Sequence, residues 1–219
     1  MVDEYRDVRC GGVLTSNVYL KSDIMFTEKK ALLLDMNGTF MFSEDKFGDS
    51  EDFSVHYYKI GGVLPQLKIN QIVRAAYQYL DIRYPDENYR HRFPSLESAI
   101  LEVGGKTLER SELEKIIETF AFHELGYIPS EYAAALHKLR QRFTLAAVID
   151  IWSPKKAWLK EFERAGISGL FSATSFSSEH GMVKPSPKPY ELVLSQLGIC
   201  ASEAVVVGDS PPRRPVTVG

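Results

Sequence analysis

Two aspartates, far apart in the sequence, each follow a short apolar run. Asp35 follows residues 31–34 in the segment DMNGT, and Asp209 follows residues 204–207 in the segment GDS. If both runs are strands of one open parallel sheet, both carboxylates lie at the edge where such sheets bind ligands. Mg²⁺ takes only part of its octahedral shell from protein groups, and two carboxylates can supply that part. The pattern therefore predicts a divalent-cation site at this edge.

A lysine between these aspartates adds a positive charge to the predicted edge. Lys184 lies in the loop GMVKPSP, just before an expected helix. A lysine there can neutralise a phosphoryl group, and a helix N-terminus also favours an anion. Each residue alone has a plainer interpretation. Asn37-Gly38 is a strong turn signal, Asp35 can bond its own backbone, and many lysines are simply solvated. Asp, Lys and Asp in this order are much less expected by chance, so together they indicate an active site or the remnant of one.

Continuous apolar runs predict the strands that carry these residues. Buried parallel strands are apolar throughout rather than alternating, and the candidates are residues 31–34, 143–149, 204–207 and, more weakly, 170–176. Helix signals separate the last three. Ser153-Pro154 and Ser186-Pro187 both read as an N-cap followed by proline, and Gly198 ends the second helix. The alternation predicts right-handed parallel βαβ units.

The stretch between the first two strands is helical instead. Residues 69–80 carry an apolar stripe, Ser111 and Glu114 form a capping-box pattern, and Pro129-Ser130 begins a further helix. The sequence thus predicts an α/β core, residues 1–45 and 141–219, interrupted by a helical domain of residues 46–140.

Three segments together resemble a known superfamily. ALLLDMNGTF, VKPSPKPY and VVVGDS are similar to motifs of the haloacid dehalogenase superfamily of phosphatases, phosphonatases, dehalogenases and mutases. The segments DMNGTFMF, HELG and DIWS resemble the sequences of a bacterial subgroup of uncharacterised hydrolases. The resemblance spans about residues 31–210. It implies a Rossmann-like parallel sheet with an inserted α-helical cap domain, and a hairpin flap at residues 39–45.

The resemblance also implies roles for individual residues. Asp35 would be the nucleophile of a phosphoryl transfer through an aspartyl-phosphate, with Mg²⁺ offsetting the repulsion between two anions. Asp35, the backbone carbonyl of Asn37, and Asp209 would hold the Mg²⁺. Lys184 would hold the nucleophile and the transferred group together, and Thr39 would contact the substrate, a small phosphorylated molecule.

The chain departs from the superfamily pattern near these residues. Phosphatases have a second aspartate where this chain has Asn37, which cannot transfer a proton at neutral pH, and losing a general acid-base group typically costs about 10²–10⁴-fold in rate. Dehalogenases have an aromatic residue there. Ile149 replaces a Ser or Thr hydroxyl at the end of the second strand. Asp150 and Ser153 remain candidates for substrate binding, although Asp150 could repel a phosphate and Ser153 could simply be a helix N-cap.

The last residues are a further departure. After Ser210 the sequence reads PPRRPVTVG, in which three prolines forbid an ordinary helix, and Arg214 stands about where a second acidic residue is expected. We expect an atypical or truncated end that leaves residues 205–207 exposed.

Composition excludes several classes of protein. Apolar residues make up 44% and charged residues 25%, and the net charge is -3, so no basic field points to nucleic acid. No apolar run approaches the roughly 18 residues that span a bilayer, and residues 1–30 do not resemble a signal peptide. We expect a cytoplasmic protein without a membrane partner. A homodimer is compatible with the sequence.

The sequence therefore favours a Mg²⁺-dependent hydrolase, a phosphatase for a small phosphorylated metabolite. Asp35, Lys184 and Asp209 support it. Asn37, Ile149 and the end of the chain favour a binding or regulatory protein that keeps the fold without the activity. A dehalogenase-type hydrolase is the third alternative.

Overall fold

Four short apolar segments form one parallel sheet. In the computed structural model, which describes residues 28–43, 46–104 and 107–209, the strands are β1 (Ala31–Leu34), β2 (Thr144–Ile149), β3 (Phe171–Phe176) and β4 (Ala204–Val207). Their order is β3-β2-β1-β4, and every neighbouring pair is parallel. All four predicted strands are confirmed. Because the strands are parallel, their carboxyl ends lie at one edge of the sheet.

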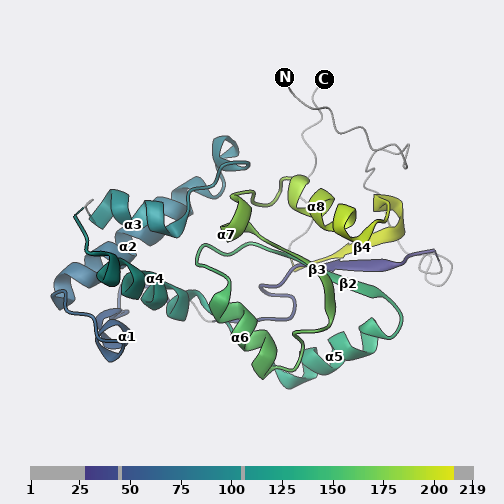
Figure 1. Cartoon of the computed structure of the whole chain (residues 1–219), viewed down its shortest axis with the longest axis horizontal. Helices are drawn as coiled ribbons and strands as arrows, with labels where there is room; N and C mark the ends of the chain where they lie inside the picture. The colour runs from purple at the N-terminus through teal and green to yellow at the C-terminus, as the bar shows by residue number, and fades with distance from the viewer. Residues whose placement is uncertain (1–27, 44–45, 105–106, 210–219) are drawn as a thin grey trace.

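Helices cover both faces of this sheet (Figure 1). Leu32, Leu34, Leu145 and Ile149 belong to an apolar cluster with α5 (Ser130–Arg140) and α6 (Lys156–Arg164). Alternate strand residues, among them Leu33 and Val148, pack instead with Val193 of α8 (Lys188–Leu197). Burial on both faces explains why the strands are continuously apolar. The architecture is α/β and Rossmann-like.

A helical cap is inserted between β1 and β2. It contains α1 (Ser54–Lys59), α2 (Gln66–Arg83), a short 3₁₀ helix (Glu87–Tyr89), α3 (Leu96–Gly104) and α4 (Arg110–Glu124). These helices lie beside the sheet domain (Figure 1), around an apolar cluster of their own that includes Phe53, Ile69 and Phe120. The sequence groups α5 with the insertion, but its Ala133 and Leu136 pack in the cluster of the sheet.

Two of the predicted helix starts are wrong. α6 begins at Lys156 with Lys155 as its N-cap, so Ser153 does not cap it. Ser153 is fully buried, and its N–H donates to the carboxylate of Glu124 in the helical cap domain. α4 begins at Arg110, one residue before the expected cap Ser111, and Arg110 pairs with Glu114. The Ser153 hydroxyl is buried and accepts no N–H group of α6 among the described residues.

The start and end of α8 agree better with the sequence. α8 begins at Lys188 with Pro187 as its N-cap, one residue after the expected cap Ser186, whose hydroxyl accepts the N–H of Lys188 at 3.2 Å. Gly198 ends the helix in the left-handed region, at φ 66°. Two further short elements flank it, α7 (Ser177–His180) and a 3₁₀ helix (Ala201–Glu203).

The segment after β1 does not form the expected hairpin over its described residues. The carbonyl of Met36 accepts the N–H groups of Thr39, Phe40 and Met41, which makes a tight turn. Phe42 then pairs with Tyr127, the two residues exchanging N–H···O bonds of 2.9 and 2.8 Å. The start of the insertion is thereby joined to its end. Residues 44–45 of the predicted flap lie outside the described residues.

β4 is the outer strand among the described residues. It pairs with β1, as expected, and its Val206 and Val207 are 57% and 36% exposed. The unusual segment after Asp209, including Arg214, lies outside the described residues. Within the described ranges, no helix has the length and apolar character needed to cross a bilayer.

Candidate active site

Asp35 and Lys184, 149 residues apart in sequence, meet at the carboxyl edge of the sheet. Lys184 Nζ donates to Asp35 Oδ1 at 2.5 Å and to the carbonyl of Val148 at 3.3 Å. The N–H of Met36 donates to the same Asp35 oxygen at 2.7 Å. Both side chains are partly buried, with 17% and 21% exposed for Lys184 and Asp35, so water screens this pair less than a surface ion pair.

The loops after β1 and β4 approach each other so closely that each uses a glycine. A Cβ on Gly38 would lie 2.5 Å from Asp209 Oδ2, and a Cβ on Gly208 would lie 3.3 Å from Asp35 Cβ. Gly38 also has φ +72°, a conformation that disfavours other residues. The two predicted carboxylates therefore lie in the same corner of the site.

The donors in this corner fit a hard divalent cation. Asp35 Oδ2 has no hydrogen bond within the described residues, and the Asp209 carboxylate lies against the turn at Gly38. The described ranges contain no group of three or more His, Cys, Asp or Glu residues arranged for a metal. Mg²⁺ does not need such a group, because it keeps several waters beside one or two carboxylates.

Gly38→Ala tests the contact with Asp209. We expect the added Cβ to displace the Asp209 carboxylate and to add about 1–2 kcal/mol of backbone strain, so Mg²⁺ affinity falls in calorimetric titration. Gly166→Ala is the matched control, since Gly166 has φ +70° and nothing within 4 Å of an added Cβ. Unchanged Mg²⁺ affinity in Gly38→Ala would contradict this placement of Asp209.

Asn37 and Asp150 form a second part of the site. Asn37 Nδ2 donates to the carbonyl of Asp150 at 3.3 Å. Asp150 Oδ2 accepts the hydroxyl of Tyr84 at 2.8 Å and the N–H of Lys184 at 2.9 Å. Burial raises the pKa of Asp150, and the nearby Lys184 ammonium opposes the rise. The Asp150 carboxylate, predicted to bind substrate, thus accepts hydrogen bonds from protein groups.

The other two predicted substrate residues, Thr39 and Ser153, have buried hydroxyl groups. The Thr39 hydroxyl is a buried polar group without a partner in the described part of the chain. Ser153 is 0% exposed and Ile149, which replaces the expected hydroxyl residue, is 1% exposed and packs in the core of the sheet. The hydroxyls of both Thr39 and Ser153 are therefore buried and have no partner among the described residues.

A buried carboxylate near the site has no functional assignment from the sequence. Glu124, the last residue of α4, accepts the N–H groups of Trp152 and Ser153 at 2.6 and 2.9 Å. It fixes the loop after β2 to the cap. Burial raises its pKa, and the hydrogen bonds from Trp152 and Ser153 oppose the rise. In the sequence, only the segment HELG draws attention to Glu124, because the residues that donate to it, Trp152 and Ser153, lie 28 and 29 residues further along the chain.

The raised pKa of Glu124 predicts a pH dependence of stability. The folded state holds the Glu124 proton to a higher pH than the unfolded chain does, so this group's contribution to stability falls as pH rises above about 4.5. Glu124→Gln removes the titration. We expect the free energy of unfolding of the native chain, relative to the variant, to decline with pH in urea titrations. Glu163→Gln on the exposed side of α6 controls for the loss of one charge; a pH-independent difference for Glu124→Gln would contradict the prediction.

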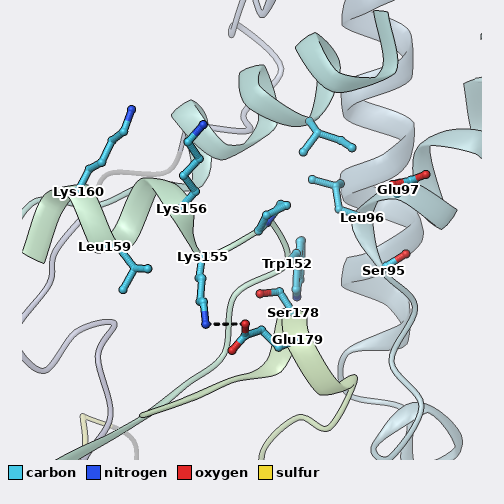
Figure 2. A pocket seen from close by; sticks show the side chains of 12 residues that line it. Ser95, Leu96, Glu97, Trp152, Lys155, Lys156, Leu159, Lys160, Ser178 and Glu179 are labelled. Atoms are coloured by element: carbon cyan, nitrogen blue, oxygen red, sulfur yellow. Dashed lines mark ion pairs between the residues drawn. The ribbon is translucent and has the colours of Figure 1, made fainter. Parts of the chain in front are cut away.

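A cleft lies between the cap and the loops that follow β2 and β3 (Figure 2). Its volume is about 560 Å³, and Leu96, Ile117, Trp152 and Leu159 form its apolar wall. Lys155, Lys156 and Lys160 line the α6 side, and Lys155 pairs with Glu179 at 2.5 Å. A second hollow of about 410 Å³ shares Trp152 and Glu179 with it and extends to Gly181.

Comparisons with known proteins agree with this architecture. A family model described as haloacid dehalogenase-like hydrolase matches residues 29–213, a range that includes Asp35, Lys184 and Asp209. A search of curated protein sequences finds no match.

Three solved structures are similar to this chain. A haloacid dehalogenase family enzyme from Bacteroides thetaiotaomicron has 20% identity and a TM-score of 0.52, covering 83% of this chain and 85% of that chain. A 2-haloacid dehalogenase from Pseudomonas syringae pv. Tomato DC3000 also has 20% identity and a TM-score of 0.52, covering 83% and 78%. A mutant of the Bacteroides enzyme, solved with magnesium and inorganic phosphate, has 18% identity and a TM-score of 0.51, covering 83% and 85%. At these identities the likeness concerns the fold.

Proposed function

The chain belongs to the haloacid dehalogenase-like hydrolase family, and on this basis we propose that it is a Mg²⁺-dependent phosphatase for a small phosphorylated metabolite. The observation that carries the proposal is the 2.5 Å contact between Lys184 Nζ and Asp35 Oδ1 at the carboxyl edge of the sheet. This contact joins an anionic nucleophile to a cation that can neutralise a phosphoryl group.

The hydrogen bonds of Asp35 orient its carboxylate. Oδ1 accepts from Lys184 and from the N–H of Met36, which holds the carboxylate in place for attack on phosphorus. A bond forms between an Asp35 carboxylate oxygen and phosphorus while the bond from phosphorus to the leaving oxygen breaks, which gives an acyl phosphate of Asp35, and the leaving oxygen takes a proton from water. A water molecule then attacks this phosphorus, the bond between Asp35 and phosphorus breaks, inorganic phosphate leaves and the carboxylate is restored. Catalysis by these residues is mainly positioning and charge neutralisation.

Asp35, the backbone carbonyl of Asn37, and Asp209 would hold the Mg²⁺. When bound, Mg²⁺ supplies Lewis-acid charge that offsets the repulsion between the carboxylate and the phosphate. The close approach of Gly38 to Asp209 supports this assignment. So does the Bacteroides mutant of the same fold in complex with magnesium and inorganic phosphate.

A panel of phosphate monoesters assayed with and without Mg²⁺ tests the proposal. We expect turnover that requires Mg²⁺ and that is highest for esters whose leaving groups need no proton, because Asn37 cannot act as an acid. Chloride release from 2-chloropropionate, measured in parallel, tests the dehalogenase alternative. Halide release without phosphate release would overturn the phosphatase proposal.

A non-catalytic binding protein is the second candidate. Two observations favour it: Asn37 lacks a transferable proton, and Ile149 is packed in the core where a hydroxyl would contact phosphate. Such a protein would bind Mg²⁺ and inorganic phosphate in calorimetry and hydrolyse no ester of the panel.

A further inference from the structure

A segment of the cap is hydrogen-bonded to the loop that carries Lys184. This segment follows α2 and includes Tyr84, Arg90 and Phe93. The N–H of Phe93 donates to the carbonyl of Gly181 at 2.7 Å, and the N–H of Val183 donates to the carbonyl of Arg90 at 3.0 Å. The two backbone bonds run in opposite directions, so the cap holds the Lys184 loop on the side that faces it.

A single carboxylate oxygen continues this connection into the site. Asp150 Oδ2 accepts both the Tyr84 hydroxyl, at 2.8 Å, and the N–H of Lys184, at 2.9 Å. Tyr84 is the C-cap residue of α2, whereas Asp150 directly follows β2. One oxygen therefore joins the cap, the end of a core strand and the backbone of Lys184.

Aromatic rings and burial surround this junction. The Tyr84 ring packs edge-on against Phe93, with ring centroids 6.0 Å apart, and lies 6.3 Å from the ring of Trp152. Asp150 Oδ1 is buried and has no partner among the described residues. A buried carboxylate is costly unless its hydrogen bonds are made, so this position favours the arrangement in which both Tyr84 and Lys184 donate to it.

We propose that Tyr84 and Asp150 are positioning residues that couple the cap to Lys184. When the cap is in the position seen here, Asp150 Oδ2 fixes the Lys184 backbone, and the Lys184 ammonium is directed at Asp35 Oδ1. When the cap moves away, Tyr84 leaves this oxygen, the two backbone bonds break, and the lysine loses its orientation. The effect of this coupling on turnover rests on the proposed function, whereas the coupling of the cap to the Lys184 loop does not. A misplacement of about 1 Å in such a group can cost on the order of 10²-fold in rate.

Tyr84→Phe removes the hydroxyl and keeps the ring. We expect amide hydrogen exchange at Val183 and Phe93 to accelerate about tenfold or more, and kcat on the best ester to fall by a similar factor with little change in KM. Tyr89→Phe in the same segment, whose ring lies near Arg83, is the matched control and should leave both quantities unchanged.

Variants of Asp150 separate its role as an acceptor from its charge. Asp150→Asn retains one oxygen that can accept both hydrogen bonds, so it should resemble the native chain more closely than Asp150→Ala in exchange and in kcat. If Asp150→Ala does not fold, Tyr84→Phe still decides the question. Native exchange in Tyr84→Phe, or faster exchange with native kcat, would overturn the coupling. If the native chain hydrolyses no ester, the proposed function fails, and the exchange experiment alone still decides whether the cap restrains the Lys184 loop.

Discussion

Asp35→Asn is expected to abolish ester hydrolysis, with kcat falling by about 10⁴-fold or more. The substituted amide is neutral and a poor nucleophile, so no bond to phosphorus forms at this position. The amide oxygen can still accept the N–H of Met36, which donates to Asp35 Oδ1 at 2.7 Å in the native chain. The local turn should therefore persist, and circular dichroism should show an unchanged fold.

The control for this prediction is Asp81→Asn, which changes an exposed aspartate of α2 in the same way. It should keep native turnover. A complementary measurement is trapping of phosphate on the protein by rapid acid quench, which should succeed with the native chain and fail with Asp35→Asn. Native activity in Asp35→Asn would show that the covalent mechanism is wrong.

Asn37→Asp is expected to increase turnover of esters with poor leaving groups by about 10²–10⁴-fold. The new carboxyl group supplies the proton that an alkoxide leaving group requires. Activated aryl phosphates should gain much less, because their leaving groups depart without a proton. While it is protonated, the new carboxyl group can also donate to the carbonyl of Asp150, as Asn37 Nδ2 does at 3.3 Å in the native chain, so the local geometry can be kept.

The ratio of the two gains is the decisive measurement. Plotting log kcat against the pKa of the leaving group should give a shallower slope for Asn37→Asp than for the native chain. An equal increase in turnover for both ester types would show that Asn37→Asp acts on substrate binding or on protein stability and not on proton transfer. A loss for both would show that Asn37 does not occupy the acid-base position.

The sequence by itself determined the sheet and its chemically active edge. The runs that contain Leu33, Val148 and Val206 are apolar and bounded by polar residues, and each forms its predicted strand. Once these strands are parallel, chain geometry brings the residues after β1 and β4 to one edge. The proximity of Asp35 and Asp209 could therefore be anticipated from strand direction alone, whereas Lys184 comes from the loop after α7 and its position depends on the contacts of that loop.

Local signals were less reliable where distant groups compete for the same backbone. Ser153 has the sequence of a helix cap, yet its N–H donates to Glu124, 29 residues earlier. The turn signal at Asn37-Gly38 is real, but the chain then pairs Phe42 with Tyr127 rather than with a second hairpin strand. A helix cap or a turn contributes about 1 kcal/mol, which is less than the burial of several apolar side chains in the core contributes.

Only the tertiary structure decided which residues connect the cap to the site. Tyr84 and Asp150 are 66 residues apart, and Glu124 and Trp152 are 28 apart. No periodicity or local preference specifies these pairs, because their contacts depend on how the cap packs against the sheet domain. The sequence determined which chemical groups reach the edge of the sheet. The packing of the cap determined which of them are directed at Asp35, and which hold Lys184 in place.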